Sequence, residues 1–327
     1  MDKFDLKDRK ILYQLDANSR QSLTQIGKKV GLKKDVVLYR IKRLEDKGVI
    51  RNYTTFFDIL KLGLIGVRFC YVFQYTTPKI KKEIIDYFVN SDLTTYIFST
   101  DGKFDLEVQF SIRSAYEFFE FHEKTLMKYG DYFSEREFIV NGSHLNLSHS
   151  FLLNENKERK IANVFKLSKD NIFNIIDEID GLDKNILKIL SNNARIPTIQ
   201  IAKKLNSTSR TINNRIKKLK NLGIITCFSC SINYPKIGYN FYVVSIEFKK
   251  YLKIKKIIDN LVKNPNLMYI ESIVGYGDYN FAFLVKDVYS LRKIMDDLIQ
   301  KYPDTIRKYN YQSYLQVHKN KALPDIF

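Results

Sequence analysis

Two basic, polar stretches of the chain carry the residue types that contact double-stranded DNA. Lys33 to Lys47 holds six basic and three acidic residues, and Thr208 to Leu222 holds five basic residues and no acid. Arginine pairs with guanine and asparagine with adenine, while any cation neutralises phosphate. The DNA-binding candidates are Lys33, Lys34, Tyr39, Arg40, Lys42 and Arg43 in the first stretch, and Thr208, Ser209, Arg210, Asn213, Asn214, Arg215, Lys217 and Lys218 in the second. Since acids repel phosphate, the second stretch is predicted to be the better reader.

The first stretch is expected to be the third of three short helices. Apolar residues recur at helical spacing from Leu6 to Leu15 and from Leu23 to Val30, the second run ending at a glycine. Lys34 to Lys47 repeats this pattern and ends at another glycine. Val49 to Phe57 is rich in β-branched and aromatic residues and predicts a β-hairpin wing. The whole reads as a winged helix-turn-helix, whose last helix enters the major groove.

The second stretch belongs to an internal repeat. Shifted by 175 positions, the 56 residues from Asp8 to Gly63 match Asp183 to Gly238 at 18 identities without a gap. The identical pairs include Ile11/Ile186, Leu12/Leu187, Arg20/Arg195, Arg40/Arg215, Leu44/Leu219 and Gly48/Gly223. The chain is therefore a tandem duplication, with a second winged helix-turn-helix in its second half.

Composition fits a folded protein with a polyanionic partner. The 327 residues are 45% hydrophobic and carry a formal charge of +18, which favours nucleic acid over an acidic membrane surface. No apolar run reaches the length of a membrane span, and three cysteines are too few for a disulfide framework, so we expect a cytoplasmic protein. Cys227 and Cys230 form a CxxC inside a predicted strand and are interpreted as incidental, with no metal.

A second pattern follows each helix-turn-helix unit. Residues 66–147 alternate strands and helices in the order β-α-β-β-α-β, and residues 241–317 repeat it. This order is ferredoxin-like, and the fold class is α+β. The predicted parts are two winged helix-turn-helix domains at 1–60 and 181–236, two ferredoxin-like effector or dimerisation domains at 64–150 and 239–327, and a linker at 151–180. In the linker, 154–160 is polar, and a small packed helix is expected at 172–179.

The combination resembles the Lrp/AsnC family of transcriptional regulators. The matching motifs are the helix-one pattern Asp8 to Leu12 with Asp183, Ile186 and Leu187; RIKRLEDKGVI and RIKKLKNLGII at 40–50 and 215–225; and the turns at 102–106 and 275–279. The resemblance implies sequence-specific DNA binding, pairing through the ferredoxin-like domains and control by a small effector, often an amino acid. Two units in one chain imply an internal pseudo-dimer that recognises an asymmetric site, with further homo-oligomers expected.

The two copies differ at positions where the resemblance places function. Thr208 is suited to cap the third helix of its copy, whereas Lys33 at the equivalent position has no side-chain acceptor. The residues predicted to bind the effector are those of the two turns, Gly102, Asp105, Gly275, Gly277 and Asp278. Phe104 stands where the second turn has Gly277, so the two pockets are not equivalent. Glycine and aspartate also serve turn geometry alone, which is the competing interpretation.

Two alternatives stay open. One is an enzyme similar to the siroheme decarboxylases, which resemble paired Lrp/AsnC units but need placed histidines; His122, His144, His149 and His318 do not recur in the repeat. The other is an effector sensor that has lost the ability to bind DNA. The acidic residues of the first stretch favour this alternative. We expect no enzyme activity and no cofactor beyond the effector, because no nucleophile elbow, P-loop or HExxH motif occurs.

Overall fold

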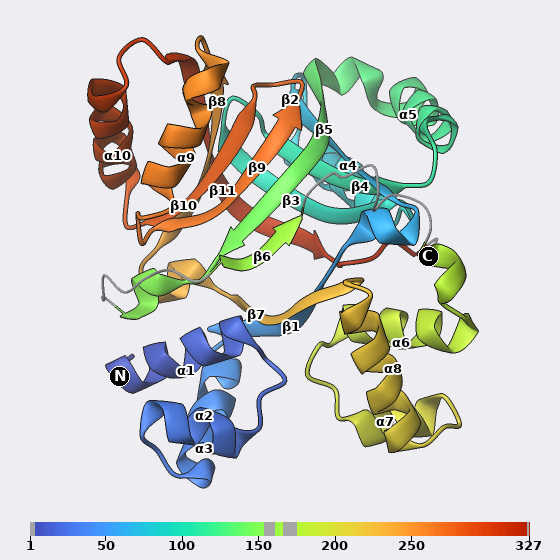
Figure 1. Cartoon of the computed structure of the whole chain (residues 1–327). Helices are drawn as coiled ribbons and strands as arrows, with labels where there is room; N and C mark the ends of the chain where they lie inside the picture. The colour runs from blue at the N-terminus through green and yellow to red at the C-terminus, as the bar shows by residue number, and fades with distance from the viewer. Residues whose placement is uncertain (1–3, 154–160, 166–174, 326) are drawn as a thin grey trace.

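The computed structural model describes residues 4–153, 161–165, 175–325 and 327. The two helix-turn-helix units lie side by side at one end of a β-barrel, and a two-stranded ribbon runs between them (Figure 1). Within the part of the chain that is described, no helix has the length and apolar character needed to cross a membrane.

The first unit consists of α1 (Leu6–Ala17), α2 (Leu23–Val30) and α3 (Lys34–Asp46). Capping boxes at Asp5 and Ser22 satisfy the free amides at the starts of α1 and α2. Gly31 ends α2 at φ 67°, a conformation that glycine adopts without strain. Lys33 precedes α3 without a side-chain cap, as the sequence predicts.

The second unit repeats this arrangement as α6 (Gly181–Asn192), α7 (Thr198–Lys204) and α8 (Ser209–Asn221). Asp180 caps α6 through a third capping box, and Thr208 caps α8 by accepting from the Thr211 amide at 3.1 Å. The predicted difference between the third helices is therefore confirmed: α8 has a side-chain cap and α3 has none.

The prediction of a β-hairpin within each unit is wrong. One strand follows each third helix, β1 (Ile50–Phe57) and β7 (Ile225–Ile232), and the two pair with each other in an antiparallel ribbon. Each strand runs into a 3-10 turn, η1 (Ile59–Leu62) or η6 (Tyr234–Ile237), that ends at a glycine with positive φ and leads to the barrel. Among the described residues of each unit there is no return strand, and the backbone groups of each strand pair with those of its counterpart.

The ferredoxin-like order is confirmed in both halves. The first half contains β2 (Ile65–Phe73), α4 (Pro78–Val89), β3 (Thr94–Gly102), β4 (Leu106–Ile112), α5 (Ala115–Tyr129) and β5 (Phe133–Leu147). The second contains β8 (Asn240–Phe248), α9 (Ile254–Leu261), β9 (Leu267–Val274), β10 (Tyr279–Val285), α10 (Val288–Lys301) and β11 (Ile306–Asn320). With the two helix-turn-helix units, these elements give the predicted α+β fold class.

The two four-stranded sheets join into a closed ring. The order is β5-β2-β4-β3 in the first half and β11-β8-β10-β9 in the second, with β3 pairing β11 and β9 pairing β5. A short strand that the sequence did not predict, β6 (Ile161–Phe165), adds to the end of β5. Helices α4 and α5 cover the outside of one half, and α9 and α10 cover the other. Strands buried on both faces, such as β4, follow from this layering.

Each helix-turn-helix core is completed by the opposite half. The first core includes Cys230 and Ile232 of β7, and the second includes Phe57 of β1 together with Leu323 near the carboxyl terminus. The predicted linker helix lies partly outside the described residues; its described end is a 3-10 turn, η5 (Ile176–Glu178), and the flanking Ile179 packs in the second core. The halves therefore share their cores.

Candidate nucleic-acid interface

Two equivalent arginines lock the helix-turn-helix units to each other. Arg20 donates from Nη1 to the carbonyl oxygens of Ala194 and Ile196 at 2.8 and 2.9 Å. Arg195 donates in return to the carbonyl oxygen of Ser19. Burial, and then the charge of Arg195, lower the pKa of Arg20. The guanidinium groups also cover aromatic rings across the interface, Arg20 over Phe228 and Arg195 over Tyr53, each 5.5 Å from the ring centre.

A second reciprocal contact closes the ends of the third helices. Lys61 donates to the carbonyl oxygen of Leu222 at the end of α8, at 2.7 Å. Lys236 donates to that of Lys47 at the end of α3, at 2.6 Å. A cation at the carboxyl terminus of a helix donates to a free carbonyl oxygen and interacts favourably with the negative end of the helix dipole. Because each lysine comes from the other unit, these contacts fix the position of one third helix relative to the other.

Four of the predicted DNA-binding cations face the interior of their own unit. Arg40 contacts Asp5 and the fully buried Asp8 at 2.9 and 2.8 Å, and Arg43 contacts Asp8 at 2.7 Å. In the second unit, Arg215 contacts Asp180 and Asp183 at 2.7 and 3.1 Å, and Lys218 contacts Asp183 at 2.9 Å. These ion pairs tie the third helix to the first and neutralise a buried aspartate.

The remaining predicted DNA-binding residues share the outer faces of α3 and α8. Ser209 is half-buried and the others are exposed: Lys33, Lys34, Tyr39 and Lys42 in the first unit, and Thr208, Arg210, Asn213, Asn214 and Lys217 in the second. The outer face of α3 also carries the exposed acids Asp35, Glu45 and Asp46, whereas the face of α8 has none. The two faces therefore differ in charge, as the sequence indicates.

The predicted effector turns lie where the two halves of the barrel meet. A β-carbon on Gly102 would lie 2.6 Å from the carbonyl oxygen of Tyr311, and one on Gly275 would lie 2.3 Å from that of Phe138. Each turn thus packs directly on a strand of the opposite half, where no side chain fits. Both aspartates serve the backbone: Asp105 accepts from the Phe73 amide and Asp278 from the Phe248 amide, each at 2.7 Å. Gly277 has φ 114° within its turn.

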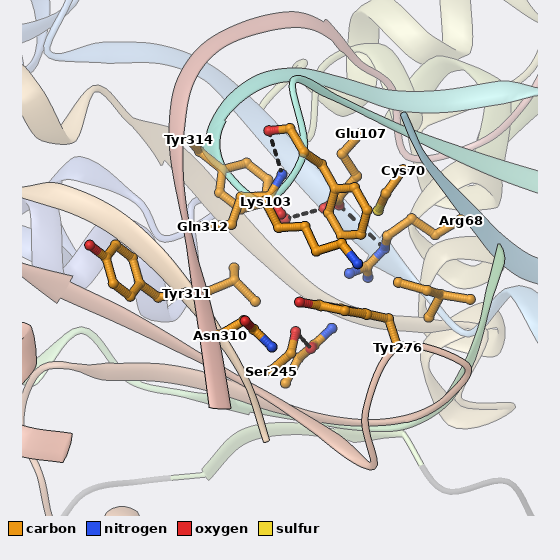
Figure 2. A pocket seen from close by; sticks show the side chains of 14 residues that line it. Arg68, Cys70, Lys103, Glu107, Ser245, Tyr276, Asn310, Tyr311, Gln312 and Tyr314 are labelled. Atoms are coloured by element: carbon orange, nitrogen blue, oxygen red, sulfur yellow. Dashed lines mark hydrogen bonds and ion pairs between the residues drawn. The ribbon is translucent and has the colours of Figure 1, made fainter. Parts of the chain in front are cut away.

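A polar cavity lies beside these turns, inside the barrel (Figure 2). Arg68 is 4% exposed and its Nη2 lies 2.7 Å from Glu271, a residue of the other half. Its Nε lies 3.3 Å from Glu107, which also accepts from the Tyr314 hydroxyl at 2.6 Å. Lys103 covers the Tyr276 ring at 4.7 Å at the side of the cavity. The free volume is about 10 Å³, enough for about one water molecule.

The two glutamates on Arg68 have opposite pKa shifts. Burial alone would raise the pKa of Glu271, but the charge of Arg68 and the contact with His144 lower it to about 2. For Glu107, burial prevails over the same arginine and raises the pKa. Glu271 is therefore the ionised partner of Arg68 across the two halves, and Glu107 holds a proton more readily.

The cysteine pair is part of the ribbon. Cys227 and Cys230 are free thiols in β7, and burial raises the pKa of Cys227 to about 12. A thiol with this pKa is neutral at physiological pH, which disfavours both nucleophilic and metal-binding roles.

Sequence reasoning missed the residues that hold the units in place. Arg20, Arg195, Lys61 and Lys236 are all identical between the copies, and identity at polar positions was the available signal. A residue that must contact the opposite unit is constrained in both copies, whereas a residue that reads a different base is not. Arg68 gave no such signal, because its partners lie on strands distant in the sequence.

Comparison with known proteins assigns the chain to a family. The model of the winged helix-turn-helix DNA-binding family matches residues 4–51 and again 179–226. The uncharacterized HTH-type transcriptional regulator PF1734 of Pyrococcus furiosus is 35% identical over 33% of this chain and 72% of its own length. LrpB of Bacillus subtilis, also an HTH-type transcriptional regulator, is 28% identical over 44% of this chain and 92% of its own length. The chain belongs to the Lrp/AsnC family.

These relatives each match less than half of this Lrp/AsnC protein, as expected if they carry one unit where it carries two. A solved structure similar over nearly the whole chain is that of the siroheme decarboxylase NirDL. It covers 97% of this chain and 94% of its own, with a TM-score of 0.62 and 11% identity. This likeness establishes that the two-unit architecture occurs elsewhere, and it concerns the fold alone.

Proposed function

We propose that this Lrp/AsnC protein is a sequence-specific transcriptional regulator that binds double-stranded DNA as a pseudo-dimer within one chain. The observation that carries the proposal is the reciprocal contact of Arg20 and Arg195, which holds two helix-turn-helix units in a fixed relation with their third helices exposed. Two linked readers on one duplex gain affinity from each other, because the second binds at a high effective concentration. The two winged helix-turn-helix domains, the two ferredoxin-like domains and the linker, with the bounds predicted from the sequence, are part of this proposal.

The outer face of α8 is proposed to supply most of the affinity. Arg210 and Lys217 are exposed without a nearby acid on that face, and Asn213 and Asn214 lie between them. The inward-facing Arg40, Arg43, Arg215 and Lys218 then act indirectly, by holding α3 and α8 against the first helices. Arginine and asparagine on a recognition helix are the side chains that read guanine and adenine.

Control by a small effector and assembly into larger oligomers remain proposals. The predicted effector residues Gly102, Asp105, Gly275, Gly277 and Asp278 are used for turns and strand contacts, and the cavity beside them accommodates about one water molecule. An amino acid would therefore bind there only with a separation of the two halves. Such a change would move the helix-turn-helix units, because their cores extend into the opposite half.

An enzyme of the siroheme decarboxylase type is the competing proposal, and its support is the shared architecture. The four histidines contact four separate groups: His122 contacts Phe69, His144 contacts Glu271, His149 contacts Asp16 and His318 contacts Ser99. General acid-base chemistry by a histidine pair would need two of them together. Addition of haem or siroheme with a search for a Soret shift distinguishes the enzyme from the regulator.

Selection of bound sequences from random DNA tests the regulator. We expect an asymmetric consensus and an affinity that falls with salt, with a slope of about −5 in log K against log salt if about six phosphates are neutralised. Binding that shows neither sequence preference nor salt dependence would overturn the proposal. The double variant Arg210→Ala, Lys217→Ala lowers affinity in the regulator and has no effect if the protein is only an effector sensor.

A further inference from the structure

Helix α3 exposes three large apolar side chains: Tyr39 lies opposite the buried residues of the helix, and Val36 and Leu38 lie on either side of it. Val36, Leu38 and Tyr39 are 40%, 37% and 62% exposed. They do not belong to the core of their unit, which takes Val37, Ile41 and Leu44 from the same helix. They lie in the first half of α3, the part of a recognition helix that contacts base edges.

The equivalent positions of α8 have different chemistry. A shift of 175 positions places Thr211, Asn213 and Asn214 where α3 has Val36, Leu38 and Tyr39. Asn213 and Asn214 are exposed; the Oδ1 of Asn213 accepts from the Thr198 hydroxyl at 3.1 Å, which leaves its amide nitrogen to face outward. An asparagine amide suits the two edge groups of adenine, so Asn214 is the better candidate. Aliphatic side chains offer no hydrogen bonds, and the base feature that they contact in the major groove is the methyl group of thymine.

We infer that the two units read chemically different half-sites: α3 recognises thymine methyl groups through Val36 and Leu38, with Tyr39 between them, and α8 recognises base edges through Asn214, with the amide nitrogen of Asn213 next to it. This inference rests on the proposed DNA binding and specifies its target. On this inference, the first unit selects its half-site mainly through van der Waals contact with thymine methyl groups.

Charges around the apolar group support DNA as its occupant. Lys33 and Lys34 at the start of α3, and Lys42 one turn beyond Tyr39, are exposed and flank the apolar side chains. Cations in these positions suit the phosphates on either side of a groove. Of the nearby acids, Glu45 accepts from the Tyr53 hydroxyl, and Asp35 lies at the first turn of α3. The first unit therefore combines weaker phosphate attraction with apolar base contact.

Replacing thymine by uracil removes the methyl group and nothing else, and it tests the inference directly. The best sequence from the random-DNA selection is synthesised with uracil in one half-site, in the other, or in both. We expect uracil in the α3 half-site to weaken binding about fourfold for each contacted methyl, the value for one buried methyl-sized group. Uracil in the α8 half-site should leave affinity within twofold.

Variants assign the half-sites to the helices. The double variant Leu38→Asn, Tyr39→Asn places the residues of α8 at these two positions of α3 and should reduce the uracil effect to the contribution of Val36. Asn214→Ala should relax base preference in the opposite half-site only. Phe119→Asn is the matched control, since Phe119 is 60% exposed on α5, away from both units, and this change should alter neither affinity nor the uracil effect.

The outcomes separate this inference from the proposed function. Absence of specific binding to unmodified DNA would remove the proposed function itself. Specific binding that is indifferent to uracil in both half-sites, or sensitive only beneath α8, would overturn the inference and leave the regulator intact. The apolar face of α3 would then be assigned to a protein contact.

Discussion

Arg20 and Arg195 stand at equivalent positions of the two repeats, and each donates to backbone carbonyl oxygens of the other helix-turn-helix unit. Side chains that donate to backbone atoms tolerate sequence change around them, because every residue supplies a carbonyl. The contact therefore preserves the relation of the two units while their reading faces diverge. Covalent linkage removes the need for both copies to recognise the same base sequence.

Replacing Arg20 by Ala should loosen this arrangement. The carbonyl oxygens of Ala194 and Ile196 lose a charged donor, and a hydrogen bond to a charged group contributes about 2 kcal/mol. We expect a lower free energy of unfolding in denaturant titration and weaker binding to a two-half-site duplex. The conservative Arg20→Lys keeps the charge and a donor for the carbonyls but loses the Nη2 group that donates to the Thr198 hydroxyl, so its loss should be intermediate. A variant as stable as the wild type would contradict the assigned role.

Much of the fold could be predicted because its signals are local. Apolar spacing and terminal glycines located α1, α2 and α3, and strand-forming residues located both β-α-β-β-α-β runs. The partner of a strand is a tertiary property. Nothing within Ile50–Phe57 distinguishes a hairpin from pairing with Ile225–Ile232, and that is where the wing prediction failed.

The candidate site shows the same limit at the level of side chains. Arg40 and Lys42 are both basic residues of α3, yet Arg40 turns inward to Asp5 and Asp8 while Lys42 is exposed. Helical spacing places Arg40 one turn from the buried Val37 and Leu44, at the boundary between the buried and exposed faces. Only the position of α1 decides its partner, and that position is set by packing between helices.

Removing Arg68 should be strongly destabilising. Arg68→Met leaves Glu107 and Glu271 buried without their cation, and breaking a buried pair in this way costs about 3 to 5 kcal/mol. Thermal unfolding measures the loss. The triple variant Arg68→Met, Glu107→Gln, Glu271→Gln should recover part of it, because no buried charge remains. Lys82→Met, at the exposed pair with Asp86, should change stability by less than about 0.5 kcal/mol.

Acid should destabilise the protein through Glu271. Its pKa is about 2 in the folded state and near 4.3 when unfolded, so its stabilisation is complete above about pH 4.3 and is lost as the pH falls to about 2. The variant Glu271→Gln should lose less stability over this window than the wild type, by up to about 3 kcal/mol. Glu107→Gln is the control, because burial raises the pKa of Glu107, the opposite of the shift in Glu271. Equal slopes for wild type and Glu271→Gln would refute the assignment.

Neither half of the chain should fold stably without the other. Two separate polypeptides, 1–165 and 175–327, leave each helix-turn-helix core without its contacts to the opposite half, including Cys230 and Ile232 for the first and Phe57 for the second. We expect neither to be a stable monomer, and we expect their mixture to form a one-to-one complex with a cooperative thermal transition. Native mass spectrometry and circular dichroism report these two properties. A first half that folds alone as a monomer would show that the shared cores are dispensable.

Two arginines of α8 should separate DNA contact from support of the fold. Arg210 is exposed, so Arg210→Ala should leave the thermal transition unchanged and weaken DNA binding by about 1 to 3 kcal/mol. Arg215 contacts Asp180 and the fully buried Asp183, so Arg215→Ala should lower the free energy of unfolding by about 1 to 3 kcal/mol. If Arg210 contacts phosphate, its removal reduces the salt slope by about one; if it reads guanine, the slope stays and base preference at one position relaxes. An Arg215→Ala protein of unchanged stability that no longer binds DNA would mean that this arginine leaves its aspartates to contact the duplex.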